Sequence, residues 1–156
     1  MSTALSQTAE HALRAVLFLA QRTTPVPVSA AAIAEALGAP ANYLSKTLHV
    51  LARAGIVLGT RGPGGGFRLA VPCRELTVAR VIGAFEDSAG SGVCLLGGRA
   101  CNANKPCAAH ERWTAVQEAS RLPLEQTTIA ELLGALARAP RGMGAEENRA
   151  VLSGAA

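Results

Sequence analysis

The chain has 156 residues, 49% of them hydrophobic and only 3% aromatic, so it can form one globular domain with a core of Ala, Leu and Val. It begins without a signal-peptide pattern and contains no apolar run of membrane-spanning length, which predicts a cytoplasmic protein with no membrane partner. The net charge of +4 is uneven, because residues 1–74 carry seven Lys or Arg against two acidic residues, whereas residues 75–156 carry eight against nine. A basic first half is typical of a nucleic-acid-binding unit.

The first half has the element order of a winged helix-turn-helix. Apolar spacing predicts an amphipathic helix over residues 7–21, followed by a Pro-containing loop over 23–28. A short helix capped by Ser29 should end at Gly38, and after a tight turn Asn42 should cap a second helix that Gly55 closes. Two such helices joined by a tight turn match a helix-turn-helix.

A β-hairpin should follow directly. Two β-compatible runs, residues 56–60 and 67–71, flank the Gly/Pro-rich turn at 61–66. A hairpin in this place is a wing, so the fold class is mainly α with a small β-hairpin wing.

The second half is predicted to be helical. Helical spacing runs over residues 76–85, and a long helix should open at Pro106 or Ala108 and reach Leu122, with a kink or break at Pro123. A last short helix, capped by Thr127 or Thr128, should follow. The domains are then 1–74 for the winged helix, 75–139 for the C-terminal helices and 140–156 for a disordered tail.

Docking of a winged helix on DNA predicts which side chains make contact. The second helix enters the major groove, so its outward residues should reach base edges, with Arg53 nearer the backbone. Arg61 and Arg68 flank the wing turn, whose glycines let backbone N–H groups approach phosphates. The candidate DNA-binding residues are Asn42, Tyr43, Ser45, Lys46, His49, Arg53, Arg61, Gly62, Gly64, Gly65 and Arg68.

Two other interpretations of these elements compete with DNA binding. The pair of helices could be an ordinary helical hairpin with solvating charges, but the wing and the charge distribution favour DNA binding. The Gly-rich turn could instead cradle a phosphate in an enzyme, which requires a helix after the loop. Residues 67–71 read as a strand, so no catalytic site is expected.

Three of the four cysteines crowd into the Gly- and Asn-rich segment 90–109. Cys94, Cys101 and Cys107 are separated by spacers of six and five residues. Thiolates in such a segment suit a soft metal or oxidation better than core packing. Cys73 stands apart and reads as a small apolar residue.

Several motifs together resemble the IscR/NsrR group of bacterial Rrf-type regulators. They are the wing decapeptide RGPGGGFRLA at 61–70, NYLSK at 42–46, ALR at 12–14 and TIAEL at 128–132. The resemblance covers roughly residues 4–137. It implies a homodimeric winged-helix repressor or activator that binds double-stranded promoter DNA, with a long C-terminal dimerisation helix and often an iron–sulfur cluster.

The resemblance also supplies a ligand set for that cluster. The three family cysteines match Cys94, Cys101 and Cys107, which leaves a four-ligand cluster one ligand short. His110 matches the histidine ligand of IscR-like members, and Glu10 the acidic ligand of NsrR-like members. A 2Fe–2S or a 4Fe–4S cluster would then sense redox state, nitric oxide or cluster supply.

Blander roles remain open for the same residues. His110 could cap the helix that follows it, and Glu10 could simply favour a helix N-terminus. The thiols could bind zinc as a Cys3His set or form a disulfide switch. The alternative function is therefore a cluster-free regulator, or an interaction domain, controlled by zinc or a disulfide.

Overall fold

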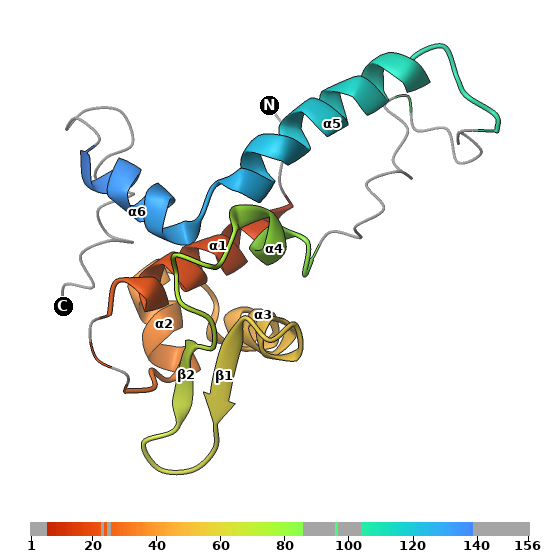
Figure 1. Cartoon of the computed structure of the whole chain (residues 1–156). Helices are drawn as coiled ribbons and strands as arrows, with labels where there is room; N and C mark the ends of the chain where they lie inside the picture. Colours follow the sequence, from red (N-terminus) through yellow and green to blue (C-terminus); the bar gives the residue numbers. More distant parts are fainter. Residues whose placement is uncertain (1–5, 23, 25, 86–95, 97–103, 139–156) are drawn as a thin grey trace.

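Six helices and one hairpin make up the described part of the chain (Figure 1). The computed structural model describes residues 6–22, 24, 26–85, 96 and 104–138. None of the helices in these ranges combines the length and apolar sequence that crossing a bilayer requires. The predicted tail, 140–156, lies outside the described residues. The elements are α1 (Gln7–Ala20), α2 (Ala30–Leu37), α3 (Ala41–Arg53), β1 (Val57–Thr60), β2 (Gly66–Leu69), α4 (Val78–Ile82), α5 (His110–Gln126) and α6 (Ile129–Arg138).

Serine side chains begin the first two helices. Ser6 Oγ accepts a hydrogen bond from the Ala9 N–H at 3.2 Å, and Ser29 Oγ accepts one from the Ala32 N–H at 3.1 Å. These bonds satisfy N–H groups that have no partner within the helix. Helix α2 ends at Gly38 in the left-handed conformation, with φ 62°. The predicted roles of Ser29 and Gly38 are confirmed.

Helix α3 begins earlier than the sequence predicts. Its N-cap is Pro40, which has no side-chain acceptor, so the prediction that Asn42 caps the helix is wrong. Proline supplies the fixed φ that leads into the helix, and its carbonyl accepts the first helical hydrogen bond, from the Leu44 N–H at 3.0 Å. Asn42 therefore lies inside the first turn. Gly55 follows the C-cap with φ 68°, as predicted.

The predicted wing is present, and Val28 pairs with its second strand through an isolated β-bridge. β1 and β2 pair antiparallel, with Val57 opposite Leu69 and Thr60 opposite Gly66. Val28, which the sequence assigns to a loop, exchanges two backbone hydrogen bonds with Phe67 at 2.9 and 2.8 Å. A Cβ at Gly66 would overlap the Val28 carbonyl group, so only glycine allows this approach.

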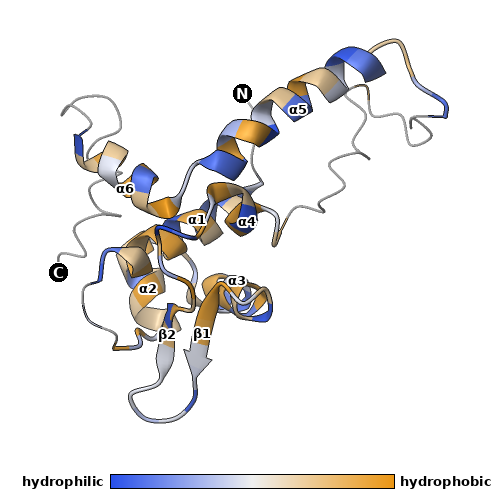
Figure 2. Ribbon diagram, viewed as in Figure 1, coloured by the Kyte–Doolittle hydropathy of each residue, from blue (hydrophilic) through white to orange (hydrophobic). Residues whose placement is uncertain are grey.

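The hydrophobic core is built around α1 and continues past the wing. Figure 2 shows α1 as largely apolar, with α4, α6 and the winged-helix elements on its sides. Alanines on α1 let these neighbours approach closely, because Ala9, Ala12 and Ala15 are fully buried. The largest fully buried side chains are Ile33, Leu44, Leu48, Leu51, Ile56, Leu76, Ile129, Val16, Val57 and Val81.

The segments that lead into α4 and α6 are paired by backbone hydrogen bonds. The Val78 N–H donates to Thr127 O at 2.9 Å, and the Ile129 N–H donates to Leu76 O at 2.8 Å. Helix α4 is shorter than the predicted run over 76–85, since it spans only Val78–Ile82 and starts after its cap, Thr77. The C-terminal helix is thereby anchored beside the winged helix.

Helix α5 is not broken at its proline. It starts at His110, later than predicted, and continues through Pro123 to Gln126. Of the predicted kink or break at Pro123, the break is therefore wrong, and the kink stays a prediction. A proline this close to the end removes one helical hydrogen bond but leaves the last turn intact. The Thr127 N–H and hydroxyl both donate to Pro123 O, at 3.0 and 2.7 Å, and close that turn.

A reciprocal cap at the start of α6 makes stability depend on pH. The Thr128 N–H and hydroxyl each donate to the Glu131 carboxylate at 2.8 Å, and Thr128 Oγ1 accepts from the Glu131 N–H at 3.2 Å. The Thr128 cap thus predicted is confirmed. The backbone bond from Thr128, and then the hydroxyl bond, hold the pKa of Glu131 below its ordinary value.

The lowered pKa gives the first prediction. The stabilising contribution of Glu131 should be present above its unfolded-state pKa and fade as the pH falls through the lower folded-state pKa. Glu131→Gln should therefore lower the unfolding temperature near neutral pH, and its difference from wild type should shrink below roughly pH 4. Calorimetry measures both, with the exposed Glu118→Gln as control. A difference that stays constant down to pH 3 would contradict the prediction.

Candidate nucleic-acid interface and thiol site

Helix α3 presents one buried and one exposed face. Leu44, Thr47, Leu48 and Leu51 are buried against the core. Four polar side chains lie on the exposed face at helical spacing and form what we call the reading stripe: Asn42, Lys46, His49 and Arg53. The outward direction predicted for Asn42, Lys46 and His49 is confirmed, and their contact with DNA stays a prediction.

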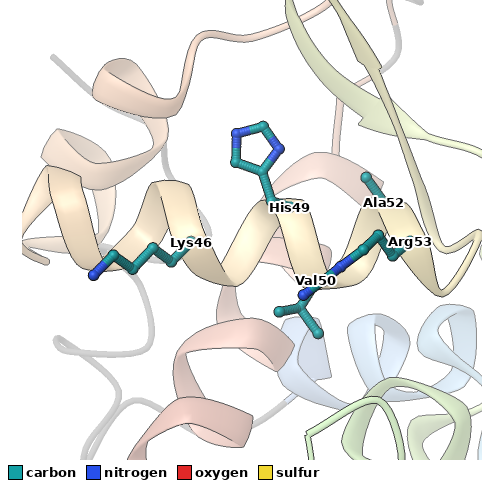
Figure 3. Close-up of a pocket in the computed structure, with 5 residues that line it drawn as sticks. All are labelled: Lys46, His49, Val50, Ala52 and Arg53. Atoms are coloured by element: carbon teal, nitrogen blue, oxygen red, sulfur yellow. The ribbon is translucent and has the colours of Figure 1, made fainter.

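The reading stripe borders an open depression. The depression has a volume of about 710 Å³ and is lined by Lys46, His49, Val50, Ala52 and Arg53 (Figure 3). Its lining combines the basic Lys46 and Arg53 with His49 and with the small or aliphatic Val50 and Ala52. Such a surface accepts an anionic partner better than an apolar one.

Tyr43 and Ser45 differ from the rest of the predicted set, because both are half-buried. The Tyr43 hydroxyl donates a hydrogen bond to Thr8 Oγ1 on α1 at 2.6 Å. The His11 ring, also on α1, meets the Tyr43 ring edge-on with 5.4 Å between centroids. Their outward direction is thus confirmed only in part.

His49 connects the reading stripe to the wing. Its ring stands edge-on to Phe67 of β2, with 5.6 Å between centroids and an interplanar angle of 79°. Phe67 is buried, whereas His49 is exposed. The contact therefore fixes the position of the wing relative to α3.

The wing carries two exposed arginines around a tight turn. Arg61 and Arg68 are both exposed, and no described carboxylate lies within ion-pair distance of them or of the cations on the reading stripe. The turn closes through a 2.9 Å hydrogen bond from the Gly65 N–H to Gly62 O, with Gly64 at φ 73°. Since Pro63 and Gly64 occupy its centre, this is the pattern of a type II turn.

Two of the candidate metal ligands lie at the start of α5. The His110 N–H donates to the carbonyl of Cys107 at 3.0 Å, so these residues share one turn and both are half-buried. Cys94 and Cys101 lie outside the described residues. Glu10 is exposed in the first turn of α1. Among the described residues, no three His, Cys, Asp or Glu side chains are grouped closely enough to hold a metal ion.

Sequence patterns missed three residues that position the interface. Thr8 and His11 contact Tyr43, and Val28 pairs with Phe67. Contacts between residues far apart in the chain leave no local pattern. The only local feature near these residues is that His11 follows the candidate ligand Glu10. That feature does not predict the contact between His11 and Tyr43 on α3.

Comparisons with known proteins agree on the fold. The model of the Rrf2 family, described as an iron-dependent transcriptional regulator, matches residues 5–135. IscR of T. potens superimposes with a TM-score of 0.68 at 28% identity, covering 91% of this chain and 96% of that one. CymR, the global cysteine regulator of B. subtilis, gives a TM-score of 0.68 at 23% identity over 86% and 98% of the two chains, and shows the shared fold alone.

A curated relative matches at higher identity. The HTH-type transcriptional regulator IscR of Vibrio atlanticus strain LGP32 is 32% identical over 130 residues, covering 83% of this chain and 74% of the relative. The predicted fold class is confirmed, and so is the expectation that the chain is not an enzyme, because the family consists of regulators. The chain belongs to the Rrf2 family of DNA-binding transcriptional regulators.

Proposed function

We propose that this regulator works as a cytoplasmic homodimer whose affinity for promoter DNA is controlled by an iron–sulfur cluster on Cys94, Cys101 and Cys107. The observation that carries the proposal is the turn at the start of α5. There Cys107 and His110 are joined through the backbone at 3.0 Å, in a family described as iron-dependent. A thiol and an imidazole on one turn are donors of the kind that hold iron–sulfur clusters.

The chemistry of this turn fits such a group. It precedes the N-terminus of a helix of 17 residues, where the helix dipole favours negative charge such as that of thiolates. Cys107 would supply one thiolate, and Cys94 and Cys101 the other two. When bound, the cluster would supply a centre that reacts with oxidants or nitric oxide.

The fourth ligand would come from His110 or Glu10. His110 is on the same turn as Cys107, whereas Glu10 is exposed on α1 and free to meet a second copy of the chain. A carboxylate from the partner would tie the ligation state to α1, which contacts α3 through Tyr43. A coupling of a few kcal/mol between ligation and operator affinity is typical of allosteric proteins.

The homodimer would form through α5. No residue of this helix is buried, although it contacts α4 and Leu124 packs against the core. Val116 and Leu122 are 54% and 55% exposed, and they lie on a face with small or apolar neighbours, Ala115, Ala119 and Pro123. Figure 1 shows α5 projecting away from the wing. A second copy would cover this face.

On DNA, α3 would enter the major groove and the wing would lie beside it. The N-terminal members of the reading stripe, Asn42 and Lys46, would reach base edges, with His49 behind them. Arg53, Arg61 and Arg68 would contact phosphates, and the backbone N–H groups of Gly62 and Gly64 would lie along the DNA backbone. Gly65 would hold the turn in shape, because its N–H donates to Gly62 O. Two subunits would read two related half-sites.

The second prediction separates base reading from phosphate binding. Lys46→Ala should weaken operator binding by about 1–3 kcal/mol and relax selectivity at one base pair per half-site. Arg61→Ala should weaken all sequences equally and reduce the slope of log affinity against log salt by about 1. Binding assays on an operator selected from random DNA measure both, with Arg138→Ala on α6 as control. Equal behaviour of the three variants would contradict this division.

The third prediction concerns the cluster. Anaerobically purified protein should be coloured and contain iron and sulfide, and Cys107→Ser should lose both, whereas Cys73→Ser should keep them. Of Glu10→Ala and His110→Ala, the variant lacking the fourth ligand should lose its cluster faster in air. Colourless protein with stoichiometric zinc, or a metal-free protein with a reversible disulfide, would establish the cluster-free alternative instead.

The fourth prediction concerns assembly. Val116→Lys should shift sedimentation from dimer to monomer and weaken binding to a two-half-site operator. The control is Thr114→Lys, because Thr114 is exposed and lies two positions from Val116, so the two side chains point in opposing directions. Thr114 is also not three or four positions from any residue of the proposed face. A monomeric wild type, or equal dimerisation of the two variants, would contradict the assignment of α5 to the interface.

A further inference from the structure

The Tyr43 contact is a polar link between α1 and the recognition helix that base reading does not explain. The Tyr43 hydroxyl donates to Thr8 Oγ1 at 2.6 Å, across 35 positions of sequence. The His11 ring packs on the Tyr43 ring at an interplanar angle of 81°. His11 is itself held by its Nδ1, which lies 2.9 Å from the Gln7 carbonyl oxygen. Both partners of Tyr43 thus belong to the first turns of α1.

The end of α3 that this link reaches has no side-chain cap. The N-cap is Pro40, and no side chain accepts a hydrogen bond from the first turn. Helix ends that lack a side-chain cap are less stable and fray more readily. Tyr43 is the third residue of the helix, one position after Asn42 and three before Lys46. The link therefore holds the turn from which the reading stripe begins.

We infer that Tyr43 is a positioning residue: its hydroxyl, bonded to Thr8, holds the first turn of α3 on α1 and so sets where Asn42 and Lys46 meet the operator. It reads no base itself. The inference rests on the placement of α3 in the major groove proposed above, but not on the cluster. A tyrosine that instead turned outward to DNA would have to leave both Thr8 and His11.

A double-mutant cycle tests the link. Tyr43→Phe removes only the hydroxyl and keeps the ring beside His11. Thr8→Val removes the hydroxyl on α1 that accepts the hydrogen bond. Each variant should weaken operator binding by about 2- to 10-fold, the effect of one hydrogen bond. The double variant should bind no more weakly than either single one, because all three lack the same bond.

Selectivity and local opening distinguish positioning from the other roles. Tyr43→Phe should weaken binding to the operator and to its single-base variants by the same factor. It should also speed amide hydrogen exchange at Leu44, whose N–H makes the first backbone hydrogen bond of the helix, to Pro40 O. Gln7→Ala, an exposed change on the same turn of α1, is the control and should leave both quantities as in wild type.

Three results would overturn the inference. The first is a loss confined to one base pair, which would make Tyr43 a reader. The second is normal operator binding by Thr8→Val. The third is a lower melting temperature with unchanged operator affinity and unchanged exchange in α3, which would make the bond merely structural. If Lys46→Ala leaves selectivity unchanged, the proposed placement of the reading stripe is refuted instead. The double-mutant cycle between Tyr43 and Thr8 tests the link independently of that result.

Discussion

Burial of α1 on nearly all sides is the constraint on which the rest of the molecule depends. With only 3% aromatic residues, the chain lacks large side chains to fill space between distant elements. The helices instead pack closely against one another, and the small, fully buried side chains of Ala9, Ala12 and Ala15 allow this on α1. Helices α2, α3, α4 and α6 all contact α1. A shift of α1 would therefore change the packing of all four of these helices.

In the function proposed above, this arrangement brings base reading and sensing to the same few residues. The first turns of α1 hold Thr8 and His11, which contact the recognition helix, and Glu10, which faces solvent. Glu10 and His11 are adjacent in the chain, but Glu10 faces solvent whereas His11 contacts Tyr43. If a cluster binds Glu10, a change in that ligation acts on α1 within one helical turn of Thr8 and His11, the residues that contact Tyr43. No long chain of intermediates is needed between the two sites.

The sequence predicted elements where local chemistry decides and missed those where distant residues decide. Ser29, Gly38 and the Gly/Pro turn act through their own backbones, so the first helices and the wing could be predicted. Asn42 failed as a cap because Pro40 already begins the helix. Tyr43 lies on the border between the two faces of α3, and only its partner 35 residues away decides its direction.

The glycines of the wing have a consequence for how such regulators diverge. A side chain at Gly65 would overlap the Thr60 carbonyl oxygen, and one at Gly66 the Val28 carbonyl group, so both residues are fixed by contacts within the protein. The wing motif, on which the resemblance to the family partly rests, is thus fixed at these two positions by packing within the protein. The residues that would choose an operator lie elsewhere, on the open surface of α3. Promoter preference can drift there while the wing stays the same, so relatives with identical wings need not control the same genes.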